Sequence, residues 1–228
     1  MINYCLYGRA GYKVLPTPNA QITEDKDAMI HTIIFDIGNV LVDFDWSRYI
    51  HTLFTDEDMI SRINNAIFAS GLWPEFDRGV MDDEEIISQM IANAPELADE
   101  IRLAINRAGD CIFRLDYAIP WIQSLKKRGF KILYLSNYSH RLRVANPEAL
   151  DFLSEMDGGV FSYKVKLIKP DPAIYQCICE KYALVPAETI FIDDNKDNVK
   201  AAKDFGLQTI QFVNYEDAQE KLDSKLEN

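Results

Sequence analysis

The stretch His31-Thr-Ile-Ile-Phe-Asp-Ile-Gly-Asn-Val-Leu-Val-Asp-Phe-Asp45 decides how the rest of the sequence is interpreted. It begins with the short apolar run Thr32–Phe35, which lacks alternation and predicts a strand buried on both faces. The run ends at a carboxylate, Asp36, and Gly38 follows where the backbone can turn sharply or approach a ligand closely. Because open α/β sheets bind ligands at the carboxyl ends of their strands, Asp36 is either a functional acid or an ordinary turn residue.

Composition limits the classes of partner. The chain has 228 residues, of which 48% are hydrophobic, so it can form one sizeable domain or a domain with an insert. Its formal net charge of −12 argues against binding to nucleic-acid phosphates and to anionic membrane surfaces. No apolar run approaches the ~20 residues that a membrane-spanning helix needs. We therefore expect no nucleic-acid or membrane partner.

The cysteines and histidines carry no recognisable chemistry. The four cysteines lack the spacing of a zinc site or of a disulfide framework, so reduced thiols are expected. The three histidines form no metal-ligand pair and stand near no plausible nucleophile. The N-terminus lacks the basic start and apolar block of a secretory signal. These features together favour a cytoplasmic protein, while the sequence does not indicate an oligomeric state.

Two regions differ in their sequence pattern. From residue 117 onward, strand-like and helix-like segments alternate, which indicates a parallel sheet with helices on both faces. Residues 46–116 instead show apolar residues at helical spacing and no clear strand signal. We predict an α/β fold in which residues 29–45 and 117–228 form a Rossmann-like, doubly wound parallel sheet and residues 46–116 form a helical cap. Residues 1–28 are expected to be an N-terminal extension. The expected strands are 32–35, 130–135, 160–162, 189–192 and 207–213.

Polar side chains follow the predicted strands where the strands end. Asp36, Ser136-Asn137 and Asp193-Asp194 each end a strand, and Lys169 stands just before a helix. Each could singly be a turn, cap or surface residue, but parallel strands bring their carboxyl ends to one edge. Crowded carboxylates repel one another without a cation, which favours Mg²⁺ with oxygen ligands. The lysine, hydroxyl and amide groups suit a phosphoryl group.

Four motifs in this order resemble those of the haloacid dehalogenase-like (HAD) hydrolase superfamily. They are Phe35-Asp-Ile-Gly-Asn-Val-Leu41, Leu135-Ser-Asn137, Lys169-Pro-Asp-Pro172 and Phe191-Ile-Asp-Asp-x-x-x-Asn198. The resemblance covers residues 31–213, and the helical insert is similar to the superfamily's C1-type α-helical cap. The first motif and the spacing of the others look most like bacterial sugar-phosphate phosphatases of the glucose-1-phosphatase kind.

The resemblance implies a nucleophile and a metal site. Asp36 would attack phosphorus, form an aspartyl-phosphate that water then hydrolyses, and also bind Mg²⁺. Gly38 would offer its backbone carbonyl to the metal. Asp194 would bind the metal directly, and Asp193 directly or through water.

The resemblance also implies how substrate is held. Ser136 and the backbone around Asn137 would hold the phosphoryl oxygens. Lys169 would bridge Asp36 and the phosphate, and Asn198 would support the last loop. The implied activity is the Mg²⁺-dependent hydrolysis of a small phosphorylated metabolite, with a sugar phosphate as the expected class.

One position departs from the superfamily pattern. Its phosphatases usually have a second Asp two residues after the nucleophile, which serves as general acid and base, but this chain has Gly38 there. General acid–base help is typically worth ~10²–10⁴-fold in rate. Asp43 is the candidate substitute, and the alternative interpretation is an ordinary loop acid.

Two other functions compete with the phosphatase. A haloacid dehalogenase also uses an Asp nucleophile, but it needs no metal and resembles a pattern without the paired acid of Asp193-Asp194. A weakly catalytic binding or regulatory protein on the same scaffold would explain Gly38 but not the retained Asp36, Lys169 and Asp194.

Residues 72–79, Leu-Trp-Pro-Glu-Phe-Asp-Arg-Gly, interrupt the helical pattern of the cap. We expect them to form a loop that faces the site, with Trp73, Glu75 or Arg78 contacting the leaving group. The alternative is a connecting loop whose aromatic residues pack into the cap.

Overall fold

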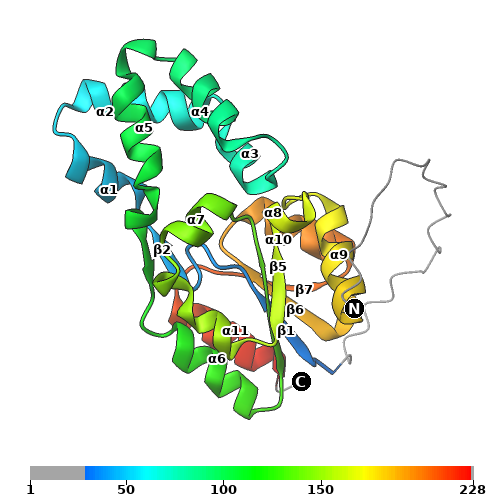
Figure 1. The fold of residues 1–228 in the computed structure, drawn as a ribbon. Helices are drawn as coiled ribbons and strands as arrows, with labels where there is room; N and C mark the ends of the chain where they lie inside the picture. The colour runs from blue at the N-terminus through cyan, green and yellow to red at the C-terminus, as the bar shows by residue number, and fades with distance from the viewer. Residues whose placement is uncertain (1–28, 227–228) are drawn as a thin grey trace, which may run out of the picture.

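The protein is described by a computed structural model that covers residues 29–226, so the predicted N-terminal extension lies outside the described residues. Within this range a parallel sheet with strand order β5-β4-β1-β6-β7 forms the centre of the molecule (Figure 1). The predicted strands are confirmed, with ends shifted by a few residues at most. Their bounds are β1 Thr32–Phe35, β4 Lys131–Ser136, β5 Gly158–Phe161, β6 Thr189–Asp193 and β7 Gln208–Gln211.

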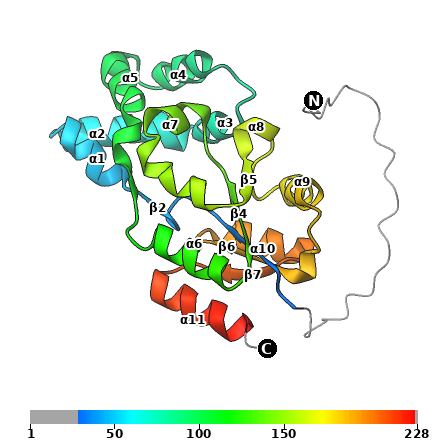
Figure 2. The same cartoon turned by 60° about the horizontal axis from the view of Figure 1, so that its bottom comes forward.

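Helices cover both faces of this sheet (Figure 2). One face carries α6 (Ala118–Lys127) and α11 (Tyr215–Leu226), and the other carries α9 (Pro172–Tyr182) and α10 (Lys196–Phe205). Strand β1 is buried throughout, and its side chains alternate between the two apolar cores. This burial on both faces explains why its sequence reads as an unbroken apolar run.

The strand order places β1 at the point where the chain reverses its direction of winding. From β1 the chain crosses to β4 and then β5 on one side, and it returns to β6 and β7 on the other. Sheets of this kind bind ligands in the crevice outside the carboxyl ends of the strands at such a reversal. Asp36, the first residue after β1, therefore stands at the favoured position for chemistry.

A helical cap is inserted between the first two strands of the large sheet and stands over their carboxyl ends (Figure 1). We call residues 46–111 the cap. Its principal helices are α1 (Trp46–Leu53), α2 (Glu57–Asn64), α3 (Trp73–Arg78), α4 (Asp83–Ala92) and α5 (Ala98–Asn106). Shorter elements are the π-helical turn η1 (Asn65–Ala69), the 3-10 turns η2 (Pro95–Leu97), η3 (Ala108–Cys111), η4 (Glu148–Glu155) and η5 (Pro186–Glu188), and helices α7 (His140–Ala145) and α8 (Ser162–Val165).

The structure corrects two details of the predicted helical insert. First, residues 46–116 contain a strand, β3 (Ile112–Arg114), which pairs antiparallel with β2 (Val42–Phe44) and so ties the two ends of the cap together. Second, residues 73–78 form the helix α3 rather than a loop. Pro74 is tolerated because it lies in the first turn, where its missing N–H would be unpaired anyway.

The aromatic residues of α3 pack within the cap. The Trp73 ring lies 5.7 Å from that of Trp46 and 5.1 Å from that of Phe68. Glu75 and Arg78 are paired with each other through an N–O distance of 3.4 Å. These contacts favour the packing interpretation of Trp73, Glu75 and Arg78. None of the helices in residues 29–226 has the length and apolar character required to cross a bilayer.

Candidate active site

Lys169 is the cation at the centre of the site. Its Nζ lies 2.9 Å from Asp36 Oδ1 and 2.6 Å from Asp193 Oδ2, and its side chain is fully buried. Burial alone would lower the pKa of Lys169, but the charges and hydrogen bonds of the two carboxylates raise it above the usual lysine value. The lysine therefore stays charged, and it offsets the repulsion between two buried acids.

Asp193 is the most completely bonded carboxylate of the site. Its Oδ1 accepts from the backbone N–H of Asn195 at 2.8 Å, and Asn198 Nδ2 lies 3.1 Å from both oxygens. With Lys169 on Oδ2, Asp193 has little acceptor capacity left. This arrangement fits the predicted role of Asn198 in supporting the loop. It also favours the indirect, water-mediated form of the predicted metal role of Asp193.

Three carboxylates converge beside the lysine. Oxygen atoms of Asp36, Asp193 and Asp194 all lie within 4.8 Å of one another. Burial raises the pKa of Asp36, Lys169 lowers it and the Asp193 charge raises it further, with a net upward shift. Burial likewise raises the pKa of Asp194. A hard divalent cation would reverse these shifts, so the donor set fits Mg²⁺ bound through carboxylate oxygens and water.

Asn39 was not identified from the sequence, yet it positions one of these acids. Its Nδ2 donates to Asp194 Oδ2 at 3.2 Å, and its backbone adopts a left-handed conformation with φ of 55°. Asn tolerates this conformation better than most residues do. The Gly38-Asn39 pair after a strand was the available signal, because both residue types are frequent where the backbone turns sharply.

Ser136 and Asn137 end β4 next to β1, as expected. The Ser136 hydroxyl is buried and helps to lower the pKa of Asp36 through a hydrogen bond. The Asn137 side chain holds the backbone of Lys169 from both sides: its Nδ2 donates to the carbonyl at 2.9 Å, and its Oδ1 accepts from the N–H at 2.8 Å. The side chain of Asn137 is thus occupied in positioning Lys169. Any contact with phosphate from this residue falls to its backbone, as the resemblance implied.

Gly38 and Asp43 leave the question of the second acid open. A Cβ built at Gly38 would meet no atom within 4 Å, so the position beside the nucleophile is spacious. Asp43 lies in β2 opposite Phe113 and is exposed to solvent. It does not belong to the carboxylate group around Lys169. The geometry therefore lends no support to a catalytic role for Asp43, and the metal role of the Gly38 carbonyl stays a prediction.

Residues 30–206 match the haloacid dehalogenase-like hydrolase family. The chain belongs to this family. The resemblance of its four motifs is thereby confirmed, and the protein is an enzyme of the hydrolase class. Among curated relatives, the D-ribitol-5-phosphate phosphatase of Bacteroides thetaiotaomicron is 26% identical, over 85% of this chain and 97% of the relative. A phosphatase of Mycobacterium tuberculosis is 28% identical, over 78% of this chain and 85% of the relative.

Solved structures share the HAD fold. A HAD family enzyme of Bacteroides thetaiotaomicron, in complex with magnesium and inorganic phosphate, has a TM-score of 0.65 and 21% identity over 81% of this chain and 94% of its own. The L-2-haloacid dehalogenase of Xanthobacter autotrophicus has a TM-score of 0.59 and 19% identity over 86% of this chain and 83% of its own. Both similarities concern the fold.

Proposed function

We propose that this HAD hydrolase is a Mg²⁺-dependent phosphomonoesterase that acts on a small phosphorylated metabolite through an aspartyl-phosphate at Asp36. The observation that carries the proposal is the convergence of the Asp36, Asp193 and Asp194 oxygens beside the buried Lys169. Such a group of acids calls for a divalent cation, and the remaining positive charge suits the anionic oxygens of a phosphoryl group.

The reaction proceeds in two displacements. An Asp36 carboxylate oxygen attacks phosphorus, a new P–O bond forms, and the bond from phosphorus to the leaving alcohol breaks as that oxygen takes up a proton. Water then attacks the phosphorus of the aspartyl-phosphate, loses a proton, and releases inorganic phosphate with the free Asp36 carboxylate.

The surrounding residues prepare the nucleophile. Both Lys169 Nζ, at 2.9 Å, and the Ile37 N–H, at 2.7 Å, contact Oδ1 of Asp36. These contacts fix the carboxylate before substrate arrives, which is the part of catalysis that a rigid sheet edge can supply. Mg²⁺, held by Asp36 and Asp194 with Gly38 and Asp193 as the further predicted ligands, would offset negative charge on the phosphoryl oxygens.

A sugar or sugar-alcohol phosphate is the substrate class we propose. This chain matches nearly the whole length of the curated relative named a D-ribitol-5-phosphate phosphatase, and this similarity supports that substrate class. The predicted cytoplasmic location and the absence of nucleic-acid and membrane partners accord with a small polar substrate, and they stay predictions.

The dehalogenase remains the alternative within the family, because a solved dehalogenase shares the fold. Asp194, whose side chain accepts a hydrogen bond from Asn39, favours the metal-dependent reaction, since a dehalogenase needs no such acid. A catalytically weak binding protein is the second alternative.

Phosphate release separates these functions. We would assay sugar 1- and 6-phosphates, ribitol 5-phosphate, nucleotides and p-nitrophenyl phosphate with Mg²⁺ and with EDTA. Mg²⁺-dependent release from at least one ester is expected. Turnover of a 2-haloacid without any phosphate release would favour the dehalogenase, and no turnover of either class by the folded protein would favour the binding protein.

A further inference from the structure

The proposed reaction leaves one chemical task unassigned. The alcohol that departs from an alkyl phosphate needs a proton, and the attacking water must later lose one. The position that usually serves this purpose in the superfamily is Gly38, which has no side chain, and Asp43 is exposed on β2. An acid from another element must therefore perform this task if alkyl esters are hydrolysed quickly.

Helix α3 of the cap is fastened to the rim of the sheet by hydrogen bonds. The Ser162 hydroxyl, at the start of α8, donates to the backbone carbonyl of Asp77 at 2.6 Å. The same oxygen accepts from the Tyr138 N–H at 2.9 Å. Lys166 Nζ also donates to the carbonyl of Gly79. Tyr138 directly follows the Asn137 that holds Lys169, so these bonds connect α3 to the catalytic loops.

Asp77 lies where the cap meets the catalytic loops, because its backbone carbonyl is bonded to Ser162. It is half-buried near the end of α3, and its pKa is raised to about 7, chiefly by burial. The charge of Asp36 contributes to this rise, and the charge of Lys169 opposes it. The Asp77 carboxyl is thus near enough to Asp36 and Lys169 for their charges to act on it. The charge of Asp77 also raises the pKa of the buried Tyr138.

We propose that Asp77 of the cap is the general acid and base of this enzyme and takes the place of the acid that Gly38 lacks. The inference rests on the proposed phosphatase function. In the first displacement, the Asp77 O–H gives its proton to the departing alcohol oxygen as the P–O bond breaks. In the second, the Asp77 carboxylate takes a proton from the attacking water, which restores its starting form.

A cap residue in this role links proton transfer to closure. Because α3 is bonded to α8 here, a proton from Asp77 would be delivered with the cap against the rim. Lids of this kind complete a catalytic group in many enzymes. The space above Gly38 is then available to the substrate or to the Asp77 side chain.

The test compares leaving groups. Asp77→Asn removes the proton donor with almost no change in shape, and kcat/KM is measured on p-nitrophenyl phosphate and on an alkyl sugar phosphate. A p-nitrophenolate leaves without help, whereas a sugar alkoxide does not. We expect a loss of about 10²-fold or more on the alkyl ester and little change on the aryl ester.

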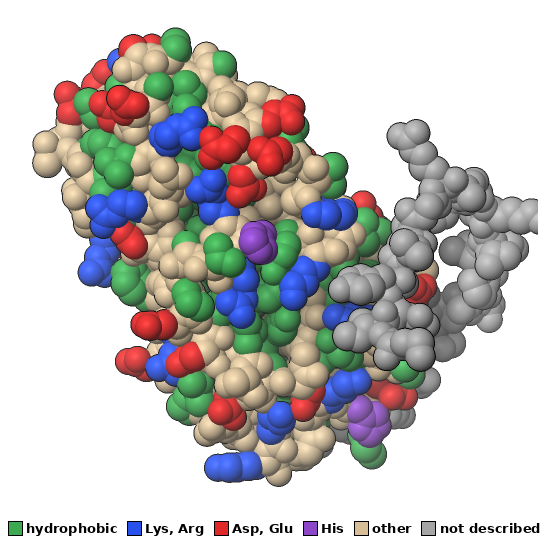
Figure 3. Space-filling view, viewed as in Figure 1, with side chains coloured by type: hydrophobic (Ala, Val, Ile, Leu, Met, Phe, Trp, Pro, Cys, Tyr) green, Lys and Arg blue, Asp and Glu red, His purple; other side chains and the backbone are tan. Residues whose placement is uncertain are grey.

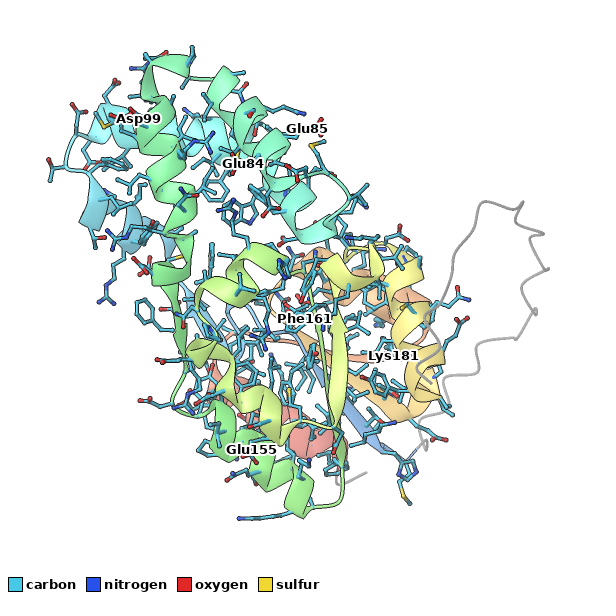
Figure 4. The ribbon with its side chains drawn as sticks, viewed as in Figure 1. Glu84, Glu85, Asp99, Glu155, Phe161 and Lys181 are labelled. Atoms are coloured by element: carbon cyan, nitrogen blue, oxygen red, sulfur yellow. The ribbon has the colours of Figure 1, made fainter. Side chains whose placement is uncertain are left out.

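Asp99→Asn is the matched control, because Asp99 is an exposed cap acid on α5, far from the rim in Figure 4. It should leave both rates unchanged. Gly38→Asp in the Asp77→Asn background should recover turnover of the alkyl ester, since the position has room for a side chain. An Asp77→Asn protein that is folded and loses equal factors on both esters, or on neither, overturns the inference. A wild-type protein that hydrolyses neither ester overturns the proposed function itself.

Discussion

At the scale of single residues, Lys169 determines whether the site can exist without metal. It is the cation that contacts both Asp36 and Asp193, and it is enclosed against the ring of Phe191 at 5.3 Å. Removing one partner of a buried ion pair costs far more than the pair contributes, because a charge is left buried and unpaired. The site is therefore built around a cation whose loss cannot be compensated by solvent.

Lys169→Met should lower the free energy of unfolding by about 3–5 kcal/mol at neutral pH without Mg²⁺. The loss should shrink as pH falls. Without the lysine the folded-state pKa of Asp36, already raised, rises further, so folding is opposed only above the unfolded carboxyl value of about 4. Urea unfolding at neutral pH and at mildly acidic pH measures both effects.

Lys200→Met is the control for that variant. Lys200 is exposed on α10 and pairs with Asp204 one helical turn away, so its replacement should change little. Equal destabilisation by the two substitutions, or a Lys169→Met loss that grows as pH falls, would contradict the account of the buried lysine.

At the scale of elements, the Ser162 hydroxyl is one of the groups that hold α3 against the rim. Ser162→Ala removes the bond to Asp77 O and leaves the buried Tyr138 N–H without its acceptor. An unpaired buried donor costs about 1–3 kcal/mol. We expect a fall of that size in the free energy of unfolding and a selective loss of alkyl-ester turnover.

Ser154→Ala provides the comparison, because the Ser154 hydroxyl also donates to a backbone carbonyl, that of Asp151, but at an exposed turn. The Tm of this variant and its rates on the two esters should be close to those of the wild type. A Ser162→Ala protein as stable and as active as Ser154→Ala would show that the hydroxyl does not fix α3.

The elements that the sequence predicted are those with strong local patterns. The large-sheet strands follow apolar, β-branched runs that end in turn residues, and the structure confirms them. Strand β3 was missed because its three residues, Ile112–Arg114, carry no such run and owe their conformation to pairing with β2. Helix α3 was taken for a loop because Pro74 and Gly79 suggested breaks, although they stand at its start and just beyond its end.

The residues of the site likewise differ in how far a local sequence pattern predicts their position. Asp36, Ser136, Asp193 and Asp194 could be placed together from sequence because each ends or follows a strand of one parallel sheet. Asp77 could not, since its position depends on how the cap leans over the rim, and no local pattern encodes that tertiary arrangement. In sequence it is one acid among several in a charged stretch.

At the scale of the whole molecule, the net charge of −12 is not evenly distributed. Figure 3 shows acidic side chains gathered on the cap part of one face and basic side chains mainly below them, near the junction with the sheet. Arg141 of α7 pairs with Asp83 of α4 at 3.3 Å across this junction. Ion pairs thus join the two parts, but exposed pairs of this kind contribute little to stability.

Metal binding should stabilise the whole fold, because the three carboxylates come together only in the folded chain. At a Mg²⁺ concentration of 100 times Kd the gain is about 2.7 kcal/mol, and it appears as a rise in Tm. Asp194→Asn should require more Mg²⁺ for the same rise. Superimposable Mg²⁺ titrations of the two proteins would exclude Asp194 as a ligand.

The most direct test of the central claim is phosphate release by Asp36→Asn with Mg²⁺ and p-nitrophenyl phosphate. The leaving group of the aryl ester needs no proton donor, so the first displacement tests the nucleophile without the proton of Asp77. Turnover should be abolished while circular dichroism remains that of the wild type, because an amide is nearly isosteric but a far poorer nucleophile. Release near the wild-type rate by the folded variant would contradict the assignment of Asp36 and the aspartyl-phosphate mechanism with it.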